Sequence, residues 1–221
     1  MSKHTPSSYS RLDRALHKLA FDSKFLQGVL ADMERSMYAR QWQDITVDQP
    51  IFITSLPRAG TTIVLQTLNR LCFLAAHTYR DMPFVLTPVL WDKVSRGFRR
   101  TSKPAERAHG DGLVIDEDSP EAFEEVLWTR YFPGHYDQAG IDCWQDSGQH
   151  GGFERAFRMH MQKMILLRSS GTSAGSRYIS KNNANIARIA YLQKLFPDAQ
   201  FVVPVRHPLE QAISLLRQHR N

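Results

Sequence analysis

The sequence predicts an α/β fold, with helices on both faces of a central and mostly parallel sheet. Two segments carry this prediction, residues 50 to about 72 and residues 177–221. Each places a short apolar strand before a turn and a helix with apolar periodicity. Because alternating strands and helices are typical of parallel sheets, we expect both segments to contribute to one sheet.

The composition indicates an ordinary globular chain that binds anions. The 221 residues are 42% apolar and 23% charged, which fits one domain with a helical appendage. A formal net charge of +6 favours anionic ligands. The one dense basic run lies at 96–107 and lacks interleaved aromatic residues, so we interpret it as a solvated loop. No nucleic-acid partner is expected.

Membrane spans, secretion signals and metal sites are not predicted. No stretch approaches the roughly 18 apolar residues of a transmembrane helix, and residues 1–10 lack an apolar signal region. The two cysteines, Cys72 and Cys143, have no metal-ligand spacing and suggest no disulfide framework. We therefore expect a cytoplasmic protein without a metal, whose oligomeric state cannot be read from the sequence.

The N-terminal segment, residues 1–45, is expected to be helical. Leucine, valine and methionine recur at spacings of three, four and seven over residues 9 to about 40. This periodicity predicts one amphipathic helix packed against the main domain, residues 46–221, and a dimerisation helix is the alternative.

The first strand–turn–helix unit predicts an anion site. An apolar strand, Ile51–Ile53, precedes a turn, and a helical pattern follows. Backbone N–H groups at a helix N-terminus, reinforced by the helix dipole, bind anions. Gly60 allows the backbone to approach an oxyanion closely, Thr61 and Thr62 add hydroxyl donors, and Arg58 adds a positive charge.

This turn is not the usual nucleotide-binding P-loop. Ser55 stands where the pattern G-x-x-x-x-G-K-[ST] has its first glycine, and Thr61 stands where it has lysine. The departure disfavours a nucleotide kinase or NTPase, which remains one alternative. A non-catalytic nucleotide-binding fragment is the other.

The middle of the chain, 73–175, is broken by prolines and predicts helices near 85–98, 119–131 and 152–169. We expect Glu121, Glu124 and Glu125 to lie on the exposed face and first turn of the second helix.

The C-terminal part regains a clear rhythm. Strands are predicted at 178–180 and 201–205, although Pro204 is unusual in a buried strand, and helices at 186–195 and from 209 onward. The chain stops at Asn221 inside the last helix, which leads us to expect a fragment. Arg206 ends the second strand, and Ser214 lies about two helical turns into the next helix. An arginine at this edge of a sheet is suited to a phosphate.

Together these motifs resemble those of the sulfotransferases that use 3′-phosphoadenosine 5′-phosphosulfate (PAPS). The stretch 54–62, TSLPRAGTT, resembles their 5′-phosphosulfate loop, P-[KR]-[SA]-G-T-T. Arg206 and Ser214 resemble their 3′-phosphate site, and the lead-in FPDAQF at 196–201 is similar to that of bacterial members. The resemblance implies a P-loop-like domain that uses PAPS as co-substrate, without a metal, to sulfate a hydroxyl or amine acceptor.

The resemblance also assigns binding residues. The 5′-phosphosulfate would be held by Arg58, Ala59, Gly60, Thr61 and Thr62, and the 3′-phosphate by Arg206 and Ser214. Residues 91–176 would form the acceptor-binding insertion. The acceptor, a small molecule or a macromolecule, cannot be read from the sequence.

Five residues are candidates for the chemistry. Arg58 would neutralise charge that grows on the leaving phosphate. Lys181 could meet a phosphate or the sulfuryl group, or could be a solvated strand-end lysine, and Asn183 could orient the acceptor. Asp81 is the first choice for general base, because tyrosylprotein-type members, whose branch the chain resembles, carry a glutamate at a similar distance from the loop. Its alternative role is the N-cap of the helix predicted near 85. His109 is the second choice for the base.

Overall fold

The computed structural model of the chain describes residues 24–97, 105–106, 114–136, 143–144, 150–169 and 175–220. Its main sheet has the strand order β2-β5-β1-β6 and is parallel throughout. The strands are β1 (Ile51–Ile53), β2 (Leu74–Ala75), β5 (Arg177–Lys181) and β6 (Gln200–Val202). The predicted parallel sheet is thereby confirmed. A separate antiparallel pair, β3 (Ala105–Glu106) with β4 (Val114–Ile115), was not predicted.

The register of the sheet brings three strand ends to one level. Ile53 at the end of β1 pairs with Lys181 of β5 on one side and with Val202 of β6 on the other. Since ligands of open α/β sheets bind beyond the carboxyl ends of the strands, this edge is where a site is expected.

The larger core lies on one face of this sheet, against α5 (Glu125–Tyr131), α6 (Gly151–Arg168) and α7 (Ile189–Leu195). Phe52 and Tyr178 project into it from the strands, and both are fully buried. Both α5 and α6 lie within the segment 91–176. This segment therefore contributes a structural layer of the domain.

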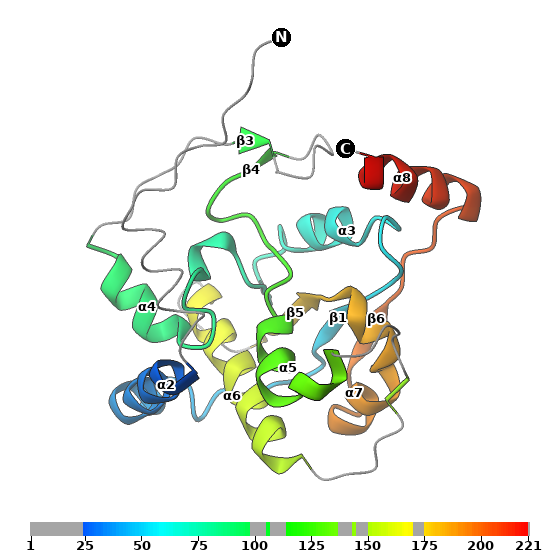
Figure 1. The fold of residues 1–221 in the computed structure, drawn as a ribbon. Coiled ribbons are helices and arrows are strands. Elements are labelled where there is room, and N and C mark those ends of the chain that lie inside the picture. The colour runs from blue at the N-terminus through cyan, green and yellow to red at the C-terminus, as the bar shows by residue number, and fades with distance from the viewer. Residues whose placement is uncertain are drawn as a thin grey trace.

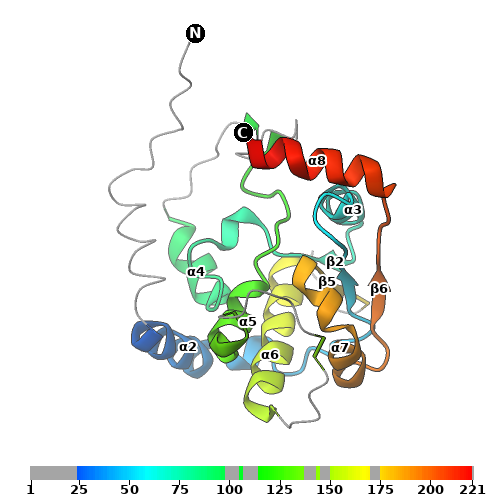
Figure 2. The ribbon, with the colours of Figure 1, turned by 45° about the vertical axis from the view of Figure 1, so that its right-hand side comes forward.

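The smaller core covers the other face, where α3 (Thr61–Leu68) packs Leu65 against Ile51, Ile53 and Ile179. This arrangement confirms the prediction of helices on both faces. Figures 1 and 2 show α8 (Pro208–Arg220) lying alongside α3, farther from the sheet, and no residue of α8 is buried.

The N-terminal helix packs onto the domain through a buried ion pair. In the part of the chain that the structure describes, this helix is α2 (Lys24–Tyr38). Glu34 of α2 is fully buried and pairs with Lys163 of α6. Its carboxylate also accepts the backbone N–H groups of Val89 (2.7 Å) and Leu90 (3.0 Å) in the first turn of α4 (Pro88–Ser95). One carboxylate thus holds three helices together.

Short 3₁₀ helices complete the described elements: η1 (Ala39–Gln41), η2 (Tyr79–Asp81), η3 (Pro133–Tyr136) and η4 (Asn183–Ala187). Among the described residues, no helix combines the length and the apolar character needed to cross a membrane.

Two boundary predictions are corrected. The second middle helix begins only at Glu125, and Glu124 is fully buried because Trp128, Tyr178 and Asn185 all donate to its carboxylate. The prediction of an exposed glutamate face was therefore wrong at Glu124. It was also wrong at Glu121, which precedes the helix and has a side chain only 10% exposed. The last strand ends at Val202, since Pro204 has no N–H group to continue a ladder.

Removing the lysine partner of Glu34 should destabilise the fold strongly. In Lys163→Met a buried carboxylate loses its cation, which costs about 3–5 kcal/mol. The double variant Glu34→Gln with Lys163→Met removes both charges and should recover part of this loss. Urea unfolding measures the change, with the exposed Lys194→Met as control. A Lys163→Met protein as stable as the control would contradict the role given to this pair.

Candidate functional site

The loop that links β1 to α3 has a strained backbone that opens toward solvent. Arg58 and Gly60 both adopt positive φ angles, +67° and +97°. Such angles are rare for residues other than glycine. A Cβ atom built on Gly60 would meet no atom within 4 Å, so space above the loop is open. The first N–H groups of α3 begin at Thr61, directly after this turn.

The loop is fastened to both neighbouring strand ends. Ser55 Oγ donates to the carbonyl of Pro204, which follows β6 (2.7 Å). On the other side, Thr54 Oγ1 donates to the carbonyl of Asn183 and Thr61 Oγ1 to its Oδ1, each at 3.3 Å. Ser55 thus has a structural partner at the position where the usual P-loop has glycine. Asn183, expected to orient the acceptor, contacts the loop instead.

The two predicted phosphate motifs meet in space. Arg58 Nε donates to Ser214 Oγ on α8 at 3.0 Å, across 156 positions of the sequence. A second contact supports this arrangement, since Gln211 Nε2 donates to the carbonyl of Pro57 at 2.8 Å. The loop after β1 and the outer helix α8 are therefore in direct contact.

Arg206 lies two residues before α8 and pairs with Glu210, one turn into that helix (3.3 Å). The side chains are 41% and 63% exposed. An ion pair this exposed is weak, and a phosphate can compete for the guanidinium. Arg206 precedes α8 and Ser214 lies within it, so the two residues predicted to hold the 3′-phosphate lie on one segment, which contacts Arg58 through Ser214.

Lys181 is buried rather than solvated, with 9% of its surface exposed. Its Nζ lies 3.9 Å from Oε1 of Glu121. The other oxygen of that carboxylate accepts a 2.7 Å hydrogen bond from the hydroxyl of Tyr79. Lys181 ends β5 beside Ile53, so this group of three borders the anion-binding loop.

Asp81 belongs to a buried network. Both of its carboxylate oxygens accept from Arg168 Nη2 at 2.6 Å, and one accepts the N–H of Thr78 at 2.9 Å, closing a capping box around η2. Burial raises the pKa of Asp81, but the nearby imidazole of His77, with Nδ1 3.6 Å from Oδ2, and the charge of Arg168 outweigh it and lower the pKa. This environment favours a structural role over a base. The predicted N-cap role is not the one observed, because Thr87 is the N-cap of α4 and Asp81 is the third residue of η2, whose N-cap is Thr78. His109 lies outside the described residues.

Sequence reasoning missed Glu121 and Tyr79. They lie on segments joined by the bridge between Thr78 and Pro120, a pairing that no local pattern predicts. The one available signal was the proline at 120, which marks a chain segment that is not helical.

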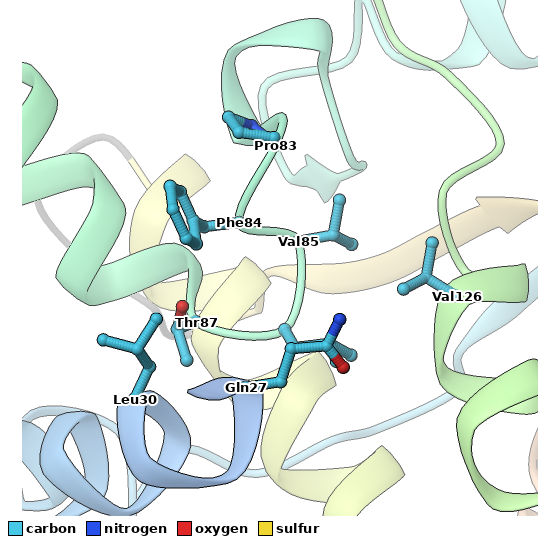
Figure 3. A pocket seen from close by; sticks show the side chains of 8 residues that line it. Gln27, Leu30, Pro83, Phe84, Val85, Thr87 and Val126 are labelled. Atoms are coloured by element: carbon cyan, nitrogen blue, oxygen red, sulfur yellow. The ribbon is translucent and has the colours of Figure 1, made fainter. Parts of the chain in front are cut away.

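An apolar pocket lies between α2, the loop 83–87 and α5 (Figure 3). The pocket contains no charged side chain, so it is unsuited to phosphate groups. Its lining residues are Gln27, Leu30, Pro83, Phe84, Val85, Leu86, Thr87 and Val126. Within the described ranges, no group of three or more histidine, cysteine, aspartate or glutamate side chains could hold a metal ion.

Comparison with known proteins places this site in a family. The pattern of the sulfotransferase family (Sulfotransfer_3) matches residues 50–221. The chain belongs to the sulfotransferase family. That match includes the loop, Lys181, Arg206 and Ser214, and no curated protein matches the chain.

Two solved sulfotransferases share the fold. STF1 from Mycobacterium tuberculosis H37Rv has a TM-score of 0.55 and 16% sequence identity, and the match covers 95% of this chain and 58% of that one. STF9 from Mycobacterium avium gives 0.54 and 16%, covering 98% of this chain and 57% of that one. The chain therefore spans less than two thirds of the length of either structure.

Replacing Asp81 should cost stability. Asp81→Asn leaves Arg168 without its buried partner, a loss of about 3 kcal/mol at pH 7. The exposed pair of Asp118 with Arg80 offers a matched control, and Asp118→Asn should change stability by less than about 1 kcal/mol. Unfolding in urea measures both.

The pH dependence follows from the lowered pKa of Asp81. The stability that its charge provides is present above the ordinary value of 3.8 and is lost as the pH falls through the lower folded-state pKa. The difference in the free energy of unfolding between wild type and Asp81→Asn should therefore become smaller at acid pH. An Asp81→Asn protein with wild-type stability but no turnover would instead support the base role.

Proposed function

We propose that this protein transfers a sulfuryl group from PAPS to a hydroxyl or amine acceptor. The observation that carries the proposal is the hydrogen bond from Arg58 to Ser214. It joins the motif that resembles a 5′-phosphosulfate loop to the motif that resembles a 3′-phosphate site. A nucleotide with phosphates on both its 3′ and 5′ positions is the ligand that would occupy both motifs.

The residues of the loop are suited to the 5′ end. The open space over Gly60, the N-terminus of α3 and the hydroxyl of Thr62 offer donors to oxyanions, and Ala59 adds its backbone to the same turn. Arg58 supplies a charge that can reach the phosphate and the sulfuryl oxygens. Arg206 and Ser214 are then left for the 3′-phosphate.

The reaction asks little covalent chemistry of the protein. As in phosphoryl transfer, positioning and charge stabilisation dominate. Arg58 and Lys181 neutralise charge that grows on the phosphate as the sulfuryl group leaves. The acceptor must lose a proton to a nearby base. Placement in the tyrosylprotein-type branch remains a prediction, because Asp81, the residue that suggested it, is held in a buried ion pair.

Calorimetric titration with adenosine 3′,5′-bisphosphate tests the proposal. Wild-type protein should bind this ligand more tightly than AMP or ATP. Arg206→Ala should weaken bisphosphate binding by about 10–100-fold, the value of a charge-assisted hydrogen bond, with little effect on AMP. Arg220→Ala, which removes a charge from the far end of α8, is the matched control and should bind as wild type does.

Three outcomes would contradict all or part of the proposal. Preference for ATP, with hydrolysis, would indicate an NTPase with an atypical loop. Equal affinity for AMP and the bisphosphate would remove the 3′-phosphate site. Selective bisphosphate binding without sulfuryl transfer would leave the binding half intact and indicate a non-catalytic nucleotide-binding protein.

A further inference from the structure

A carboxylate that the sequence did not single out lies beside the proposed sulfuryl site. Glu121 precedes α5 on a segment whose backbone is tied to η2, since its N–H donates to the carbonyl of His77 (3.0 Å). Its side chain is 10% exposed and extends to Lys181 at the end of β5. The backbone N–H of Ala122 donates to Oε1 at 2.8 Å, which fixes the orientation of the carboxylate.

Lys181 connects this carboxylate to the anion-binding loop. Lys181 pairs with Ile53, the last residue of β1, and the N–H of the next residue, Asn182, donates to the carbonyl of Ile53 (3.0 Å). Asn183 in turn contacts Thr54 and Thr61 of the loop. Glu121 therefore lies one side chain away from the carboxyl edge of β1 and β5, where the transferring group would be held.

The neighbouring carboxylates are committed to structural contacts. Glu124 is fully buried, so no acceptor can reach it. Asp81 accepts Arg168 with both oxygens. Glu125 forms a bidentate ion pair with Arg188, whose Nη1 and Nη2 donate to its two carboxylate oxygens at 2.8 and 2.9 Å. Glu121 differs from these three carboxylates in its position, because its ion-pair partner Lys181, 3.9 Å away, lies at the carboxyl end of β5.

We propose that Glu121 is the general base of the transfer, an inference that rests on the proposed function. The acceptor oxygen forms a bond to sulfur as the bond from sulfur to the bridging oxygen of the phosphosulfate breaks. The acceptor proton passes to the Glu121 carboxylate, and the electron pair of the broken bond remains on the phosphate. Sulfur keeps its oxidation state, and no further reactant is needed.

Two neighbours have positioning roles. Tyr79 donates to Oε2 and keeps the carboxylate turned toward the strand ends. Tyr79 is itself held by an edge-on contact with Phe123 at 5.5 Å between ring centroids. Lys181 lies between the carboxylate and the loop, where it can attract both the anionic donor and the ionised base.

Release of adenosine 3′,5′-bisphosphate from PAPS, measured with excess enzyme and with either water or 2-naphthol as acceptor, tests the assignment. Glu121→Gln should lower the rate by about 100-fold or more, the usual contribution of a general base. It should also lose the acidic limb of the pH–rate profile. Glu121→Asp should recover part of the rate. Glu117→Gln, on the same segment, is the matched control and should keep the wild-type rate.

Titration of each variant with the bisphosphate separates the possible failures. Unchanged affinity with a lost rate in Glu121→Gln supports the base. A Glu121→Gln rate near wild type, or an unchanged pH profile, would overturn the base assignment. Bisphosphate affinity and rate that fall together would also overturn it, because Glu121 would then only hold Lys181 in place. Wild-type protein that binds the bisphosphate but transfers to neither acceptor overturns the base and the transfer activity together, and leaves only the nucleotide site. Wild-type protein that fails to bind it overturns the proposed function as well.

Discussion

The parallel alignment of β1 between β5 and β6 is the constraint on which the site depends. Because Ile53 pairs with both Lys181 and Val202, three chain segments leave the sheet at one level. The loop after β1 can then be fastened to the segment after each neighbour, through Ser55 on one side and Thr61 on the other. A positive φ at Arg58, which is not a glycine, is maintained only in a loop so well supported.

Buried charges complement this alignment by fixing the helical layers. Glu34 with Lys163 joins α2 and α4 to α6, and Asp81 with Arg168 joins η2 to the end of α6. Such pairs add little net stability, but each is costly to break, so they define one arrangement of the helices. That arrangement places Tyr79 and Glu121 at the edge of the sheet. The structural carboxylates and the proposed base thus occupy adjacent but separate positions.

The elements formed by residues close together in the sequence could be predicted, and the contacts between distant segments could not. The strand at 51–53, the turn at Gly60 and the helix after it are encoded within about twenty residues, so their patterns were legible. Strand β2 has two residues, too few for a pattern. The contacts of Glu121 with Tyr79 and Lys181 join three segments that are distant in the sequence, so a periodic pattern cannot predict them. The burial of Asp81 and Glu124 was not predicted, because partners that the sequence does not reveal allow a carboxylate to be buried.

Hydrogen–deuterium exchange with and without adenosine 3′,5′-bisphosphate tests the central claim most directly, because it reports where the ligand is held. The account predicts slower exchange at 57–62 and at 206–214 together, since one ligand would contact both segments. The loop 83–87 at the apolar pocket should be unaffected. Protection confined to the pocket, or to only one of the two segments, would contradict a site built from the loop after β1 and the start of α8.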